Sequence, residues 1–248
     1  MKRGDKAVLS ISAVLAVAVA GAVAFSLLVL DRRPRPSAHA GDSTSSLLVL
    51  TWGPSLCRVE PDNTGCRSGH VDQLGQSFVL HGLWPQPPTE QYCDVPRKMS
   101  DSKRSPVPLP DDLRNRLQTT MSDALMTTHE WYAHGTCSGV APPEYFGIAT
   151  DLAQQVTRVL NPLFGDSAGG QISSRSVRQT FDAEFGGGAG MRVALYCKKA
   201  KGDEVAYEVR LSLPAVPDLR NGDNTLPLHT ALSRGPTIEA GCGQARVP

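Results

Sequence analysis

The chain has 248 residues, a length that fits one or two domains, and its 40% hydrophobic content is enough to build a core. Residues 1–40 hold six Lys and Arg against two Asp and Glu, which leaves 19 basic and 22 acidic residues, a net charge near −3, over residues 41–248. This charge excludes a domain that holds nucleic acid through a broad basic face, so any polyanion must bind in a small local site.

The N-terminus is expected to direct export. An uncharged apolar run over residues 7–30 follows three basic residues and is long enough to cross a bilayer, which takes about 20 helical residues. Basic residues lie on both sides of the run, and "SAHA" at 37–40 offers an Ala-x-Ala cleavage site. Residues 1–30 are therefore predicted to be a signal peptide or a membrane anchor, and the rest of the chain is expected outside the cytoplasm, either membrane-anchored or secreted.

After the apolar run, residues 31–46 are rich in Pro, Ser and Arg and are predicted to be a linker. The apolar run "LLVLTW" predicts a strand over 47–52, which opens a domain that extends to residue 248. A polar loop is expected over 60–76, a second strand over 77–84 ("SFVLHGLW"), and a long proline-rich loop over 85–110.

The second half of the chain combines helices and strands. Residues 111–126 predict an amphipathic helix with acidic residues at its N-terminus, and 142–162, bounded by prolines, predict another. A shorter helix is expected over 173–185, and two strands over 191–197 and 204–213 around the turn "KKAKGD". Helices and strands do not alternate regularly, so the fold class is predicted to be α+β in a single domain.

All six cysteines lie beyond residue 40, at positions 57, 66, 93, 137, 197 and 242. An even number of cysteines in an exported domain predicts three disulfides, with 15 connectivities open at this point. The chain has no Cys-x-x-Cys pair, so a structural zinc site is not expected.

Two short motifs hold three of the five histidines that follow residue 40: "HGLWP" at 81–85 and "HEWYAHGTC" at 129–137. These motifs resemble the two blocks that mark the ribonuclease T2 family, and they occur here in the same order, about 50 residues apart. A weaker similarity extends from Leu47 to Cys242. The resemblance implies a T2-ribonuclease-like domain over 47–248 with a central antiparallel sheet flanked by helices.

The resemblance also implies an activity, the cleavage of single-stranded RNA by an endoribonuclease that acts as a monomer and needs no metal or cofactor. The 2′-hydroxyl of RNA would attack the adjacent phosphate and give a 2′,3′-cyclic phosphate, then a 3′-phosphate. By the family pattern, His134 is the base and His81 the acid, because imidazole titrates near neutral pH. Glu130 tunes the histidine charges, His129 helps to neutralise the phosphate, and Trp84 contributes to base binding.

The family pattern further implies the disulfides Cys93–Cys137 and Cys197–Cys242, which leaves Cys57 with Cys66. Two positions depart from the pattern. Ala133 stands where a lysine usually precedes the second catalytic histidine, which predicts slower turnover unless another cation (Arg58, Arg97 or Lys98) fills the gap. Gln86 stands where many members have an acidic residue, which bears on base preference.

Two other functions are compatible with parts of the sequence. "HEWYAH" is similar to the His-Glu-x-x-His motif of zinc proteases, but zinc needs histidines four residues apart and His129 and His134 are five apart. The other alternative is an RNA-binding or signalling protein that keeps the T2 fold with weakened catalysis. The pairing of both histidines with the glutamate favours the enzyme.

Overall fold

The computed structural model describes residues 41–123 and 125–248. The predicted signal peptide or anchor, and most of the predicted linker, lie outside these residues. In the part of the chain that the structure describes, no helix is both long enough and apolar enough to cross a membrane.

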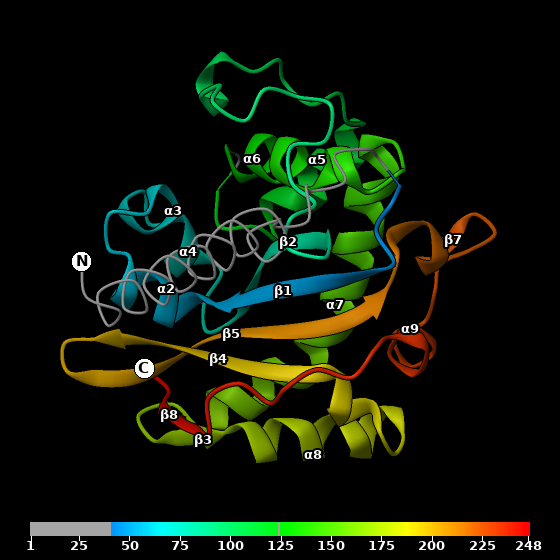
Figure 1. The fold of residues 1–248 in the computed structure, drawn as a ribbon. Coiled ribbons are helices and arrows are strands. Elements are labelled where there is room, and N and C mark those ends of the chain that lie inside the picture. Colours follow the sequence, from blue (N-terminus) through cyan, green and yellow to red (C-terminus); the bar gives the residue numbers. More distant parts are fainter. Residues whose placement is uncertain (1–40, 124) are drawn as a thin grey trace, which may run out of the picture. The chain divides into compact units, whose positions relative to one another are not determined.

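A six-stranded sheet forms the centre of the fold (Figure 1). Its strands are β1 (Ser45–Trp52), β2 (Phe78–Gln86), β3 (Gln171–Ser173), β4 (Val193–Ala200), β5 (Asp203–Pro214) and β8 (Gln244–Arg246). They run in the order β2-β1-β5-β8-β3, and β4 also pairs with β5. All pairings are antiparallel except that of β5 with β8, so the predicted antiparallel sheet is confirmed. A separate small sheet joins β6 (Arg220–Asn221) and β7 (Asn224–Thr225).

Helices flank this sheet. The α-helices are α2 (Gly53–Val59), α3 (Thr64–Arg67), α4 (His70–Gln73), α5 (Asp111–Gln118), α6 (Leu125–Ala133), α7 (Pro142–Asp166), α8 (Ser174–Phe185) and α9 (Leu228–Arg234). Short 3-10 turns are η2 (Asp101–Lys103), η3 (Gly135–Cys137), η4 (Ala189–Arg192) and η5 (Val216–Leu219). In Figure 1, α7 runs behind the strands and packs on β1 and β2, while α8 lies below them and packs on β3 and β4.

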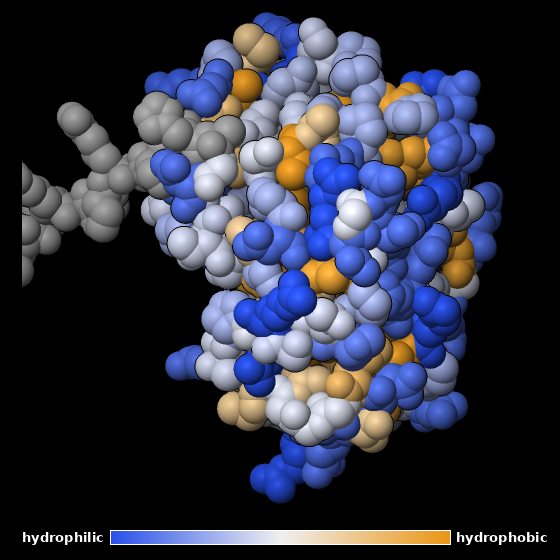
Figure 2. All heavy atoms as spheres, turned by 90° about the vertical axis from the view of Figure 1, so that its right-hand side faces the viewer, coloured by the Kyte–Doolittle hydropathy of each residue, from blue (hydrophilic) through white to orange (hydrophobic). Residues whose placement is uncertain are grey.

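The core lies between the sheet and α7. Leu48, Leu50 and Trp52 of β1 and one face of α7 belong to the same buried cluster, as expected where one face of a strand packs on an amphipathic helix. Trp52, Phe78 and Phe164 join the two layers, with ring centroids 4.6–5.3 Å apart. Hydrophilic side chains cover most of the face shown in Figure 2, and apolar ones appear there as small separate groups.

A β-bulge interrupts the pairing of β1 with β2. Val49 pairs with Gly82 and Leu50 with Leu80, so His81 is the extra residue between them. A bulge leaves one residue without a partner and changes the direction of its side chain. This local irregularity explains how a histidine can sit inside an otherwise apolar strand.

Several predicted elements are confirmed. The strands expected over 47–52, 77–84, 191–197 and 204–213 correspond to β1, β2, β4 and β5, and the helix over 173–185 corresponds to α8. A capping box at Ser173 and Ser176 starts α8. The loop expected over 85–110 begins after Gln86, where β2 ends, and is irregular apart from the turn η2. The helix over 142–162 continues past Pro162 to Asp166.

Three predictions about element boundaries were wrong. The helix expected over 111–126 ends at Gln118, because the Thr119 and Thr120 hydroxyls donate back to the Arg116 carbonyl and Met121 then bridges to Leu80 of β2.

The other two boundary errors concern polar segments. The loop expected over 60–76 contains two short helices, α3 and α4, and Asn63 caps the first of them. The linker was predicted to reach residue 46, but β1 starts at Ser45 and the buried Ser46 hydroxyl donates to the Pro214 carbonyl at 2.7 Å.

Candidate active site

His81 points from the β2 bulge toward two buried carboxylates. Its Nδ1 lies 3.1 Å from Oε1 of Glu208, on β5, and its Nε2 lies 3.7 Å from Oε1 of Glu130, on α6. The His81 side chain is 29% exposed, while the two glutamates are almost completely buried. The ring is therefore held between two acids and still open to solvent on one side.

Glu130 lies beneath the "HGLWP" segment. Oε2 of Glu130 accepts a hydrogen bond from Nε1 of Trp84 at 2.9 Å, and Oε1 has no hydrogen-bond partner among the described residues. Gly82 makes this arrangement possible, because a Cβ at this position would overlap the Glu130 carboxylate and lie 2.6 Å from Nε1 of Trp84. The glycine of the motif is therefore required for close approach.

His134 follows the last residue of α6. Its ring is stacked on Trp84, with centroids 5.1 Å apart and planes 24° apart, and His81 meets the same tryptophan edge-on at 5.1 Å. His134 is 9% exposed, and its Nδ1 is buried without a hydrogen-bond partner in the described part of the chain. The structure thus brings the three residues predicted as central, His81, Glu130 and His134, around the Trp84 ring.

The two histidines have opposite electrostatic environments. Burial alone would lower the pKa of His81, but the hydrogen bond to Glu208 and the charges of Glu130, Glu208 and Glu60 outweigh it and raise that pKa. Burial, together with the charges of His129 and His81, lowers the pKa of His134 to about 3. His134 is therefore neutral at neutral pH, whereas the surroundings of His81 favour its charged form.

Glu130 and Glu208 also differ. Burial raises the pKa of Glu130, against the opposing influence of the His81 charge and the Trp84 hydrogen bond. Burial acts the same way on Glu208, but the hydrogen bond and charge of His81 and the Arg210 guanidinium lower its pKa overall. Glu208 is therefore the more firmly ionised of the two acids that face His81.

His129 is placed by the long loop that follows β2. Its Nδ1 lies 2.9 Å from Oδ2 of Asp101, and the other oxygen of Asp101 binds Nε of Arg104 at 3.2 Å. The Arg104 guanidinium lies over the rings of Tyr92 and Tyr132, at 5.4 and 4.6 Å from their centroids. His129 thus lies on the solvent side of the site, at the edge of a cavity.

That cavity opens beside His81 and has a volume of about 520 Å³. His129 lines it together with Met126 of the same helix, Glu60 at the end of α2 and Tyr207 of β5. Its walls mix apolar groups such as Leu56 with acidic groups such as Glu60 and Asp101.

The sequence did not identify Glu208 and Arg210. Both carboxylate oxygens of Glu208 have partners. Oε1 faces Nδ1 of His81, and Oε2 accepts hydrogen bonds from Nε and Nη2 of Arg210 at 3.0 and 2.7 Å. The Arg210 guanidinium lies over the rings of Tyr196, at 3.7 Å, and Trp84, at 5.2 Å. A usable signal existed, since "EVR" places two opposite charges on one face of a strand, two residues apart.

Three basic residues were expected to supply the positive charge that Ala133 lacks. Each of them either contacts another side chain or is exposed. Arg58 pairs with Asp203 at 2.9 Å, Arg97 lies over the Tyr92 ring, and Lys98 is exposed. Ala133 itself is 2% exposed. The guanidinium that does lie beside the Trp84 ring is that of Arg210.

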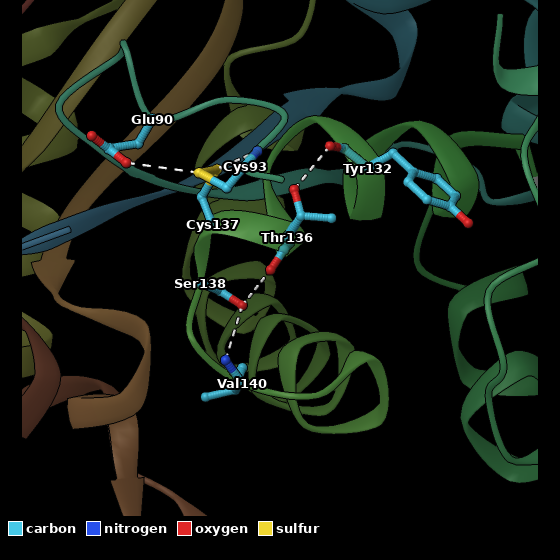
Figure 3. The surroundings of a disulfide bond; sticks show 8 residues. Glu90, Cys93, Tyr132, Thr136, Cys137, Ser138 and Val140 are labelled. Atoms are coloured by element: carbon cyan, nitrogen blue, oxygen red, sulfur yellow. Dashed lines mark hydrogen bonds between the residues drawn. A yellow bond between two sulfur atoms is a disulfide. The ribbon is translucent and has the colours of Figure 1, made fainter. Parts of the chain in front are cut away.

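The three disulfides pair as predicted: Cys57–Cys66, Cys93–Cys137 and Cys197–Cys242. The second ties the loop after β2 to the end of the "HEWYAHGTC" segment, with the buried Glu90 beside it (Figure 3). Glu90, Cys93 and Cys137 are the group of three metal-type donors found within 4.8 Å of one another in the described residues, but the disulfide removes both thiolates. This group therefore does not fit a metal ion.

Known proteins are similar to this chain in sequence and in fold. The model of the ribonuclease T2 family matches residues 44–224. A ribonuclease of Aeromonas hydrophila is 31% identical over 118 residues, 47% of this chain and 48% of that protein, so the chain spans about half the length of this relative. Ribonuclease MC of Momordica charantia is 26% identical over 176 residues, which are 66% of this chain and 84% of that protein. The structure of ribonuclease MC1 from bitter gourd seeds has a similar fold, with a TM-score of 0.57 and 19% identity over 82% of this chain and 99% of that one.

Proposed function

The chain belongs to the ribonuclease T2 family, and on this premise we propose that it is an endoribonuclease that cleaves single-stranded RNA without a metal ion. The observation that carries the proposal is the pair His81 and His134, held around one tryptophan ring with pKa values shifted in opposite directions. At neutral pH His134 is unprotonated and can accept a proton, whereas the surroundings of His81 favour the protonated form, which can donate one.

The first step is transphosphorylation. Neutral His134 takes the proton of the 2′-hydroxyl, whose oxygen attacks the adjacent phosphorus, while charged His81 protonates the departing 5′-oxygen. The products are a 2′,3′-cyclic phosphate and a free 5′-hydroxyl. Since Nδ1 of His134 is buried, Nε2 is the nitrogen offered to the substrate. DNA lacks the 2′-hydroxyl and is not cleaved in this way.

The second step is hydrolysis of the cyclic phosphate with the two roles exchanged. His81, now neutral, activates water, and His134, now charged, protonates the 2′-oxygen, which leaves a 3′-phosphate. Exchange of roles returns each histidine to its starting protonation state after one turnover.

Glu130 and His129 support the charge that develops on the phosphate. Oε1 of Glu130 faces Nε2 of His81 at 3.7 Å and has no other partner among the described residues, so it is free to share a proton with the phosphoryl oxygens. His129 lines the same cavity as His81 and adds positive charge when protonated.

Trp84 is proposed to hold the site together. Its Nε1–H fixes Glu130, and its ring contacts both catalytic histidines. Its stacking on a base of the substrate stays a prediction. The cavity of about 520 Å³ beside His81 is proposed to receive a nucleoside of the RNA.

The protein is proposed to act outside the cytoplasm as a monomer. Three disulfides support an oxidising compartment. Whether the predicted N-terminal segment anchors the domain to the membrane or is cleaved is decided by fractionation of the host: full-length protein in salt-washed membranes supports an anchor, and a soluble form that starts at Gly41 supports secretion.

The experiment that tests the proposed function compares purified wild-type protein with His134→Phe on single-stranded RNA and on DNA of the same sequence. The wild type should cleave RNA only, and the variant should bind RNA with little cleavage. Binding of RNA by the wild type without cleavage would instead support a protein that keeps the fold and has lost the chemistry.

A further inference from the structure

A buried carboxylate on β5 connects the proposed general acid to an arginine. Glu208 is 4% exposed. One of its oxygens faces Nδ1 of His81, and the other accepts two hydrogen bonds from Arg210, so both are fully used. A buried charge is costly unless it is paired and hydrogen-bonded, and here it has a partner on each side.

The sheet fixes this arrangement. Glu208 pairs with Thr51 of β1 and with Tyr196 of β4, so strands on both sides hold its backbone. Arg210 is two residues further along β5, on the same face of the strand. Its guanidinium rests on the Tyr196 ring at 3.7 Å and lies 5.2 Å from the Trp84 centroid, which limits its rotation.

We propose that Glu208 is the positioning residue of His81, and that Arg210 limits how tightly Glu208 holds the charged imidazole. The inference rests on the proposed function, in which His81 is the general acid. Glu208 and Arg210 act through His81 and do not touch the reacting atoms.

A general acid must hold a proton before the reaction and release it as the leaving group departs. A hydrogen bond from Nδ1–H of His81 to Glu208 fixes the ring orientation and leaves Nε2 on the side of Glu130, where the proposed function places the phosphate. The negative charge of Glu208 stabilises the protonated imidazole, so His81 carries the proton that it donates. A carboxylate that attracted the proton too strongly would slow its transfer, and the guanidinium on the opposite oxygen weakens that attraction.

Other charged groups also face His81 from the elements packed around it. They are Glu130 on α6, Glu60 at the end of α2, and His134 after α6. All of them are unchanged in the variants below, so a shift between variants reports the Glu208–Arg210 pair alone.

The test is an NMR titration of the His81 ring in the full-length protein without substrate. Glu208→Gln keeps an acceptor oxygen and removes the charge, so the titration midpoint of His81 should move down by about 1 pH unit or more. Arg210→Met removes the competing cation, so the midpoint should move up. Arg210→Lys should restore it toward the wild-type value. Glu204→Gln, an exposed residue of the same strand, is the matched control and should change nothing.

The kinetic readout is the pH profile of kcat/KM on RNA. Its basic limb reports deprotonation of the acid in the free enzyme, so it should move to lower pH in Glu208→Gln and to higher pH in Arg210→Met. If Glu208 and Arg210 had a purely structural role, the substitutions would lower activity without shifting the basic limb of the pH profile.

The inference is overturned if Glu208→Gln leaves the His81 midpoint unchanged, or if Arg210→Met moves it down. If Glu208→Gln fails to fold by circular dichroism, the upward shift expected in Arg210→Met and its reversal in Arg210→Lys still decide. A wild-type protein without ribonuclease activity would refute the proposed function, while the NMR titration would still judge the Glu208–His81 pair.

Discussion

Replacement of Gly82 by alanine tests how the site is packed. Gly82 lies on β2 between His81 and Trp84, and a Cβ here would overlap the Glu130 carboxylate and lie 2.6 Å from Nε1 of Trp84. The methyl group must therefore displace Glu130, Trp84 or the strand itself, and the hydrogen bond between these two side chains should break.

The magnitude follows from two contributions. A hydrogen bond to a buried charged group contributes about 1.5–3 kcal/mol, and forcing an extra methyl group into a packed site costs about 1–3 kcal/mol. The free energy of unfolding of Gly82→Ala should therefore fall by about 2.5–6 kcal/mol. Activity should fall about 10²-fold at temperatures where the variant is folded, since displacement of a catalytic group by 1 Å has an effect of this size.

The assay is urea unfolding combined with RNA cleavage at a fixed pH. Gly147→Ala on α7 is the matched control, because a Cβ there meets nothing within 4 Å and alanine favours a helix by about 0.5–1 kcal/mol. A Gly82→Ala protein with wild-type stability and activity would refute the claim that the glycine is needed for close approach to Glu130.

Four further predictions concern the same site. His81→Phe and His134→Phe should each lower RNA cleavage by at least about 10²-fold with little loss of folding; near wild-type activity in either would rule out the two-histidine mechanism. The pKa of His134 is about 3 when folded and near 6.5 when unfolded, so its contribution to stability is complete above pH 6.5 and is lost as pH falls toward 3; the urea midpoint of His134→Phe should fall less over this range than that of the wild type. Loss of the Cys93–Cys137 bridge by paired serine substitution should lower the free energy of unfolding by about 2–5 kcal/mol and reduce activity, whereas unchanged activity would show that the bridge does not hold the catalytic segment. Ala133→Lys should raise kcat on a dinucleotide at fixed salt with a smaller change in KM, because a cation stabilises the transition state more than the substrate; an unchanged kcat in a folded variant would mean that the charge is already supplied.

Local patterns in the sequence were enough to predict much of the fold. Period-two alternation identified β4 and β5, and the apolar face of α7 identified the long helix. The helix expected over 111–126 failed because leucines at helical spacing continue past Gln118, where threonine hydroxyls and a bridge to β2 compete with the helix. Such competition depends on a partner that is distant in sequence.

The candidate site was predictable only where its residues lie inside short motifs. His81, Glu130 and His134 were identified from "HGLWP" and "HEWYAHGTC". Glu208 was not, because it meets His81 across 127 positions of sequence through the pairing of β1 with β5. Asp101 was missed for a similar reason, since it lies in the long loop after β2 and meets His129 across 28 positions of sequence.

The chemistry of the site is decided most directly by the first product formed from a dinucleotide. The purified protein is incubated with an RNA dinucleotide in excess chelator, and the products are followed by phosphorus NMR. Cleavage by His134 and His81 predicts a 2′,3′-cyclic phosphate that appears first and then converts to a 3′-phosphate, unaffected by the chelator. A 5′-phosphate product, or a reaction that stops when metal is removed, would contradict the mechanism.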